Sequence, residues 1–157
     1  MKLSRRKFFV KTLQGTALLA VTPALSSFLE SCTTPSDPNG SVNNLPRLTG
    51  TESNNTLTIN IDSSSPLAKT GSAAIVAYSK GTILIDHPSD TIYNVLTSVC
   101  THQQCQINNF DSSNQEFVCN CHGSRFDVNG GVRQGPAISA LGVYSSQFAN
   151  NQLIIRI

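Results

Sequence analysis

Two cysteine–histidine segments, residues 100–105 and 119–124, constrain this chain more than any other feature of its sequence. Together they hold four of its five cysteines and two of its three histidines. Each segment follows a run of apolar or β-branched residues, so each is predicted to be a loop at the end of a strand. Four thiols and two imidazoles exceed the four ligands of one tetrahedral zinc ion. They match a two-iron, two-sulfide cluster held by two Cys and two His, together with one disulfide.

Three other uses of these residues stay open from the sequence. A mononuclear Cys2His2 zinc site would use residues 100, 102, 119 and 122, but Cys-x-His is a cramped spacing for zinc and two cysteines would be left over. Two structural disulfides would suit an exported protein. Cys105 and Cys121 would alternatively be buried free thiols. Iron content and visible absorption distinguish these alternatives.

The chain beyond residue 55 is typical of short strands. Apolar alternation or β-branched runs predict strands at residues 56–61, 72–78, 81–86, 91–98, 116–118, 141–148 and 152–157. The last two are expected to form a hairpin around Asn150-Asn151, and residues 87–90 a turn in which His87 is a solvated loop residue. No segment past residue 32 shows a helical period. The predicted fold is therefore an all-β antiparallel sandwich or small barrel, with both loops at one end.

The ordered pair of motifs, Cys-x-His-x-x-Cys and then Cys-x-Cys-His-Gly-Ser, resembles the Rieske iron–sulfur protein family over residues 72–157. The resemblance implies one [2Fe-2S] cluster per chain. Matched residue by residue, it implies that one iron is bound by Cys100 and Cys119 and the other by His102 and His122. It also implies a disulfide, Cys105–Cys121, which places the chain in the disulfide-containing branch of the family. Gly135-Pro136-Ala137 fits the proline loop that covers the cluster in that branch.

Four positions compare informatively with the family pattern. Gln104 stands where the family usually has Gly, and Asn120 where it usually has Pro; neither change removes a ligand. Ser124 matches the family Ser whose hydroxyl bonds a cluster sulfide. Phe126 stands where quinol-oxidising members often have Tyr, whose hydroxyl bonds a ligating sulfur. Ser124, Phe126 and Pro136 are therefore the residues expected to tune the cluster.

The charge of such a centre predicts its redox behaviour. Two Fe(III), two sulfides and two thiolates sum to zero, so an electron is added more easily than to an all-thiolate cluster, and Rieske potentials lie at roughly −150 to +300 mV. Because Phe126 lacks a hydroxyl donor, the potential is expected inside that range but below its top. A ligating His exposes its second ring nitrogen, so electron transfer is expected to be coupled to proton transfer.

Residues 1–31 are interpreted as a targeting segment: a basic stretch, an uncharged stretch and an exit with small residues. Residues 4–11, Ser-Arg-Arg-Lys-Phe-Phe-Val-Lys, resemble a twin-arginine export signal, which is read by a receptor and exports folded proteins. Residues 29–32, Leu-Glu-Ser-Cys, resemble a bacterial lipobox, which makes Cys32 the predicted lipid anchor. A transmembrane anchor is less favoured, because the uncharged stretch is short of the ~20 predominantly apolar residues of a comfortable span.

Residues 32–55, rich in Thr, Ser, Asn, Pro and Gly, are predicted to be a flexible linker, and residues 56–157 the folded domain. From residue 32 onward the chain has six basic and eight acidic residues, 6 − 8 = −2. This charge balance argues against nucleic acid as a partner, because a nucleic-acid binder needs a clustered basic face.

The function expected is an exported electron-transfer protein, lipid-anchored on the periplasmic side of a bacterial membrane. It would pass single electrons between a respiratory donor, with quinol as a candidate, and an acceptor such as a c-type cytochrome. Alternatives are a subunit of a quinol–cytochrome c reductase-like complex, the small subunit of a molybdenum oxidase, and an oxygenase-type ferredoxin. No catalytic site of its own is expected: an oxygenase needs a further iron held by two His and a carboxylate, and only His87 is left over.

Overall fold

The computed structural model describes residues 42–157, which form an almost entirely β domain. This confirms the predicted fold class. The strands are β1 (Val42–Asn44), β2 (Arg47–Thr49), β3 (Thr51–Ser53), β4 (Thr56–Asn60), β5 (Ser72–Tyr78), β6 (Gly81–Ser89), β7 (Ile92–Thr97), β8 (Asn109–Asp111), β9 (Glu116–Cys119), β10 (Ser124–Asp127), β11 (Val132–Gln134), β12 (Ser146–Ala149) and β13 (Gln152–Arg156), with one 3-10 turn, η1 (Pro66–Ala68). Among these residues no helix is long and apolar enough to cross a membrane.

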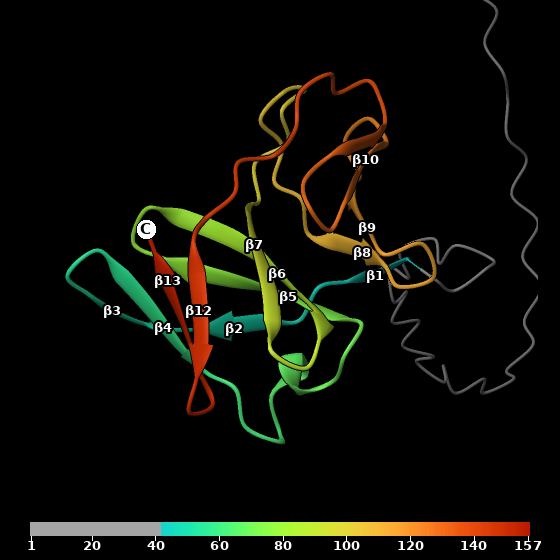
Figure 1. Cartoon of the computed structure of the whole chain (residues 1–157). Coiled ribbons are helices and arrows are strands. Elements are labelled where there is room, and N and C mark those ends of the chain that lie inside the picture. The colour runs from blue at the N-terminus through green and yellow to red at the C-terminus, as the bar shows by residue number, and fades with distance from the viewer. Residues whose placement is uncertain (1–41) are drawn as a thin grey trace, which may run out of the picture. The chain divides into compact units, whose positions relative to one another are not determined.

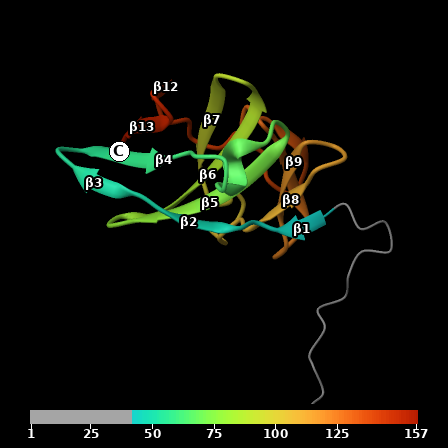
Figure 2. The same ribbon diagram turned by 90° about the horizontal axis from the view of Figure 1, so that it is seen from below.

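The strands form three sheets, in the orders β1-β8-β9-β10-β11, β2-β5-β6-β7 and β12-β13-β4-β3. All pairings are antiparallel except that of β2 with β5. In both views the sheet containing β5 and β6 lies between the end that carries β8 and β9 and the end that carries β3, β4 and β13 (Figures 1 and 2). The loops after β7 and β9, which carry the cysteine–histidine segments, belong to the β8–β9 end.

The middle sheet is buried on both faces, and this explains the unbroken apolar run of β5. Alternate residues of a strand face opposite sides of its sheet. Ala73 and Ile75 therefore join the core that also contains Phe117 and Phe126 of the first sheet. Ala74 and Val76 join a second core, with Leu57 and Ile59 of β4 and Leu153 and Ile155 of β13. The same sheet thus supports the cysteine loops on one side and the β4–β13 layer on the other.

The segment predicted to be a linker is structured from Val42 onward, which corrects the boundary at residue 55. Strands β1, β2 and β3 lie within it, each at the edge of a different sheet. Two leucines account for the difference: Leu45 is buried in the first core, and Leu48 packs against the second. The three strands also form backbone pairings with β8, β5 and β4. A polar composition does not predict these pairings, and the partners of β1 and β2 are distant in sequence.

The predicted turn at residues 87–90 begins too early, and the interpretation of His87 as a solvated residue is wrong. Strand β6 continues to Ser89, with an irregular register between Asp86 and Ser89. A bulge of this kind accommodates Pro88, which has no N–H to donate. His87 is therefore inside the sheet, 4% exposed, and its ring stacks on that of Tyr93.

The predicted final hairpin is confirmed, although its first strand is shorter than expected. Strands β12 and β13 pair around Asn150 and Asn151, whose φ values of 52° and 59° are those of a tight hairpin turn. Residues 141–145, predicted as part of the strand, run beside β7 through isolated contacts only, including the bridge between Leu96 and Val143. The predicted signal at residues 1–31 and the predicted anchor Cys32 lie outside the described residues.

Candidate metal centre

The first cysteine–histidine loop, after β7, is folded back on itself by two backbone hydrogen bonds. The Gln104 N–H donates to the Cys100 carbonyl at 2.9 Å, and the Cys100 N–H donates to the Cys105 carbonyl at 2.8 Å. Gln104 has φ of 58°, in the left-handed region. Glycine is favoured there because it has no Cβ, which explains why the family pattern has Gly at this position. Gln104 is exposed, so its side chain meets no obstacle.

The second loop, between β9 and β10, uses the same device. The Gly123 N–H donates to the Cys119 carbonyl at 2.9 Å, so the hydrogen bond again joins a cysteine to the residue four positions later. Gly123 has φ of 78° and here glycine is present. Each loop thus begins with a buried cysteine and turns sharply, which holds the histidine of the motif near the turn. Cys119 is the last residue of β9, and Cys100 follows β7 by three residues.

A disulfide joins the two loops, as the resemblance implied. Cys105 and Cys121 are bonded, with their Cα atoms 6.5 Å apart and a sequence separation of 16 residues. The bridge fixes the distance between the tips of the two loops. It also removes both residues from the set of candidate metal ligands.

The other two cysteines of the loops are free and lie side by side. Cys100 and Cys119 are both 1% exposed. Burial raises the pKa of the Cys119 thiol, and the adjacent Cys100 side chain, which is close enough for a sulfur hydrogen bond, raises it further. The sulfurs of Cys105, Cys119 and Cys121 lie within 4.8 Å of one another, so the disulfide borders the pair of thiols.

The two imidazoles also meet. The rings of His102 and His122 are 4.9 Å apart between centroids and stand edge to face. Nδ1 of His102 is buried and has no hydrogen-bond partner, whereas the His122 side chain is exposed. A buried ring nitrogen without a partner is unusual in a folded protein, and a bond to a metal would satisfy it.

A third loop, between β11 and β12, is hydrogen-bonded to both cysteine loops. The Ala137 N–H donates to Oγ of Ser124 at 3.0 Å, and Oγ1 of Thr101 donates to the Ser139 carbonyl at 2.6 Å. Because Ser124 accepts this bond, its own O–H proton stays available to another acceptor. Pro136 is exposed on this loop, next to the buried Ala137. The three loops therefore form one bonded unit.

Beneath the loops, Phe126 of β10 closes the base of the site. Its ring is fully buried in the core that also contains Cys100 and Cys119. Sequence reasoning identified this position but not the ion pairs next to it. Arg125 pairs with Asp111 of β8 and, at 2.6 Å, with Glu116 of β9. This network ties three strands together, and its acidic members gave no local sequence signal because they are distant from Arg125 in the chain.

The donor atoms fit a cluster better than a single ion. The thiols form one pair and the imidazoles another. Within the part of the chain that the structure describes, no three donors that include both a thiol and an imidazole lie within 4.8 Å of one another. A single zinc ion, with bonds of about 2.0–2.3 Å to each ligand, would not be reached by all four. A two-iron unit, with sulfur ligands on one metal and nitrogen ligands on the other, suits this division.

Comparison with known proteins agrees with this geometry. The sequence model of the Rieske [2Fe-2S] domain matches residues 59–145, more than half of the chain. The chain is 34% identical over 61 residues to the cytochrome b6-f complex iron-sulfur subunit of Prochlorococcus marinus strain AS9601, a match that covers 39% of this chain and 34% of that protein. With the same subunit of strain MIT 9211 the identity is 39% over 70 residues, 43% of this chain and 39% of that protein. The chain spans little more than a third of the length of these curated relatives.

Two solved structures share the fold. The crystal structure of the cyanobacterial plasma membrane Rieske protein PetC3 from Synechocystis PCC 6803 aligns with a TM-score of 0.54 and 29% identity, over 63% of this chain and 99% of that one. The ferredoxin of carbazole 1,9a-dioxygenase from Nocardioides aromaticivorans IC177 aligns with a TM-score of 0.50 over 62% and 95%, and its 16% identity shows a common fold alone. With its paired thiols, paired imidazoles and bridging disulfide, the chain belongs to the Rieske family of iron–sulfur electron-transfer proteins, whose cofactor is a [2Fe-2S] cluster.

Proposed function

We propose that this protein is an exported, membrane-tethered Rieske electron carrier on the periplasmic side of a bacterial membrane. It passes single electrons between a respiratory donor and an acceptor such as a c-type cytochrome. The observation that carries the proposal is the pairing of two buried thiols and two imidazoles under a disulfide, with one imidazole exposed at the surface. Such a centre is insulated on the protein side and accessible on one edge, as an electron carrier requires.

The proposed ligands are Cys100 and Cys119 for one iron and His102 and His122 for the other. Burial of both thiols and the unpartnered Nδ1 of His102 support this assignment. When bound, the cluster supplies a one-electron redox couple. The chain's own residues shield it: the disulfide sulfurs border Cys119, and Phe126, together with Ala137 and Leu141 of the third loop, packs in the same core as the two thiols.

The exposed His122 gives the site a route for protons. Its ring nitrogen on the solvent side holds a proton within reach of water or of a docked partner. Release of that proton on oxidation would couple electron transfer to pH. A midpoint potential that falls as the pH rises, near neutrality or above, is the expected result. A potential independent of pH up to about pH 10 would contradict this role.

The ligand set is tested by replacing single cysteines in the full chain. Cys119→Ser is expected to abolish the visible absorption and the low-temperature electron resonance of the reduced protein. Cys121→Ser, two residues away, is the matched control: it removes a disulfide sulfur and is expected to leave a freshly isolated protein coloured. Loss of the cluster in Cys121→Ser together with its retention in Cys119→Ser would overturn the assignment.

Export and tethering rest on the sequence signals at Arg5-Arg6 and Cys32. The similar Synechocystis protein is a plasma membrane Rieske protein, which is compatible with a membrane-associated role here. Replacing Arg5 and Arg6 by Lys is expected to leave the protein in the cytoplasm. Cys32→Ala is expected to release it from the membrane fraction into the periplasm. A Cys32→Ala protein that stays in the membrane after normal processing would contradict lipid anchoring.

A second candidate is a Rieske subunit of a quinol-oxidising complex, because the similar curated proteins are cytochrome b6-f subunits. Phe126 favours the stand-alone carrier, since quinol-oxidising members often have Tyr there. The small subunit of a molybdenum oxidase is a third possibility. Purification from native membranes in mild detergent distinguishes these candidates. A b-type haem that co-purifies in fixed proportion would favour the quinol-oxidising complex, and a molybdenum cofactor would favour the molybdenum oxidase. Either result would contradict the stand-alone carrier.

A further inference from the structure

Three sulfur atoms of the two cysteine loops lie in one place. The sulfurs of Cys105, Cys119 and Cys121 are within 4.8 Å of one another, and among the residues that the structure describes they are the only group of three or more Cys, His, Asp or Glu donors this close together. A bridge such as Cys105–Cys121 forms in an oxidising environment, whereas the cytoplasm keeps thiols reduced. Before the bridge forms, all three residues are therefore free thiols.

Cys100 supplies a fourth thiol at the edge of this group. Its side chain is close enough to that of Cys119 for a sulfur hydrogen bond, and its N–H donates to the Cys105 carbonyl at 2.8 Å. In a tetrahedral zinc site with Zn–S bonds of about 2.3 Å, neighbouring sulfurs are about 3.8 Å apart. Opening the bridge lets the sulfurs of Cys105 and Cys121, whose Cα atoms are 6.5 Å apart, separate towards this spacing.

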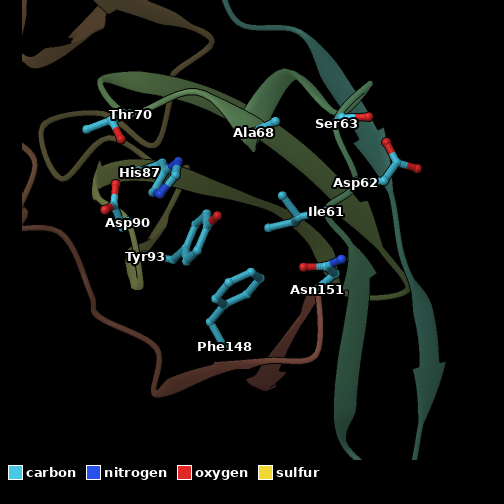
Figure 3. A pocket seen from close by; sticks show the side chains of 10 residues that line it. All are labelled: Ile61, Asp62, Ser63, Ala68, Thr70, His87, Asp90, Tyr93, Phe148 and Asn151. Atoms are coloured by element: carbon cyan, nitrogen blue, oxygen red, sulfur yellow. The ribbon is translucent and has the colours of Figure 1, made fainter.

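The histidines do not belong to this group of donors. His102 and His122 pair with each other, and neither has a ring nitrogen within 4.8 Å of two of the three clustered sulfurs. The third histidine, His87, stacks on Tyr93 at a separate cavity, which Phe148 also lines (Figure 3). This cavity adjoins the second core, on the other side of the middle sheet from the cysteines. A single metal ion at the cysteines is therefore held by sulfur alone.

The surroundings of the sulfurs accommodate the charge of such a site. Zn²⁺ with four thiolates carries 2 − 4 = −2, and residues 100–105 and 119–124 contain no Lys or Arg. The backbone N–H groups of Cys121 and His122 are directed at the sulfur of Cys119, and Cys121 is exposed to water. These donors and the solvent stabilise the negative charge in place of a basic side chain.

We propose that the reduced, cluster-free chain binds one zinc ion through the four thiols of the two loops, Cys100, Cys105, Cys119 and Cys121. Tetrahedral sets of four sulfur ligands select zinc or iron. Two of the four thiols are also the proposed cluster ligands, so the two metal states exclude each other. The Cys105–Cys121 bridge removes the two ligands that only the zinc site uses. The redox state of this pair thus decides which metal the loops hold, and the zinc site itself rests on the cysteine geometry rather than on the electron-transfer role.

Titration of the full chain with cobalt(II) and zinc tests the site. The iron-free chain is treated with a phosphine, which opens the bridge: each sulfur gains a proton, and the phosphine takes oxygen from water to become its oxide. Cobalt(II) is expected to bind with one ion per chain and to give the absorption of a tetrahedral thiolate complex, and zinc is expected to displace it. The bridged chain should bind zinc roughly a hundredfold more weakly, because two ligands are missing. Equal binding by the two forms, or no binding of zinc to the reduced chain at micromolar concentration, would overturn the proposal.

Variants count the ligands. Cys105→Ser is expected to weaken zinc binding by about tenfold or more and to lower the sulfur-to-cobalt charge-transfer absorption by about a quarter, since one of four thiolates is lost. Cys32→Ser is the matched control, because it removes a thiol outside the two loops, and it should change neither quantity. Equal losses in the two variants would show unspecific binding to thiols and refute the site.

A mixed cysteine–histidine site is distinguished by His102→Ala, which should leave the zinc affinity of the reduced chain unchanged. A loss of affinity in His102→Ala without one in Cys105→Ser would overturn the all-sulfur site. The colour of the loaded protein separates this proposal from the proposed function. Absence of the zinc site in a protein that becomes coloured refutes the zinc site alone, whereas an intact zinc site in a protein that never becomes coloured refutes the cluster alone.

Discussion

Removing the Cys105–Cys121 disulfide should measurably destabilise the domain, and the size of the effect follows from the length of the loop that it closes. The two cysteines are 16 residues apart. A loop of this length corresponds to about 3 kcal/mol of lost unfolded-state entropy at 25 °C. The cluster does not substitute for the disulfide in this respect, because an unfolded chain that has released its iron is no longer cross-linked by it.

This free energy converts into a melting temperature. At about 2.1 cal/mol/K per residue, the roughly 116 residues of the described domain have an unfolding entropy near 240 cal/mol/K, so 3 kcal/mol lowers Tm by about 12 °C. The assay is thermal unfolding of Cys105→Ala/Cys121→Ala, followed by circular dichroism and by the visible absorption of the cluster. Both signals should be lost at the lower temperature.

The control for this experiment is Cys32→Ala, which removes the remaining cysteine of the chain outside the metal centre and should leave Tm unchanged. Reducing the native protein with a thiol should reproduce the effect of the double variant. A change in Tm below about 4 °C, with the cluster retained, would refute the reasoning that the bridge acts by constraining the unfolded chain.

Three further predictions follow from buried or uncharged parts of the domain. Phe126→Tyr places a hydroxyl in the core that contains Cys100 and Cys119, the proposed sulfur ligands. One hydrogen bond of about 1 kcal/mol to the reduced state would raise the midpoint potential by roughly 40 mV in a voltammetric titration, and an unchanged or lower potential would count against it. Burial raises the pKa of Asp86 to about 7 from its ordinary 3.8, a change that the hydrogen bond from Asn94 only partly offsets. The ionised form is therefore disfavoured in the folded state, and the protein loses stability as the pH rises through this interval. In denaturant unfolding, Asp86→Asn should raise the free energy of unfolding by roughly 4 kcal/mol at about pH 8 and leave it unchanged at about pH 4. Equal gains at both pH values would exclude burial of the charge as the cause. Finally, the segments at residues 97–110, 119–124 and 134–149 contain no charged residue, and Ile138 of the third loop is 94% exposed. The rate of electron exchange with a c-type cytochrome should therefore change less than about twofold between about 20 and about 200 mM salt. A steep dependence of the rate on salt would indicate docking through charges elsewhere.

The disulfide was predicted from the resemblance to the Rieske family, because the spacing of the cysteines by itself left free thiols and other disulfides open. The shape of each loop is a more local property. A strand, a tight turn and the next cysteine lie within six residues, so residue spacing specifies most of the loop geometry. Gln104 illustrates the limit of this reasoning. Its departure from the family pattern was visible in the sequence, but the left-handed backbone that explains the usual glycine was not.

The ends of the strands were less predictable, because pairing with distant residues determines them. His87 precedes a proline, a pattern that favours a turn, yet the bulge in β6 keeps both residues in the sheet. Asp111 and Glu116 were missed as partners of Arg125 for the same reason: only the hairpin of β8 and β9 brings them to β10.

The position of β1, β2 and β3 has a mechanical consequence. Each is the outermost strand of a different sheet, so a force applied to the chain at Val42 is transmitted to all three layers in succession. A fragment that starts at Thr56 would lose one strand from every sheet and expose the unpaired backbone of β8, β5 and β4. Residues 42–53 therefore connect the layers of the domain to one another, and a truncation that extends past Leu48 would remove Leu45 from the first core and Leu48 from the side of the second.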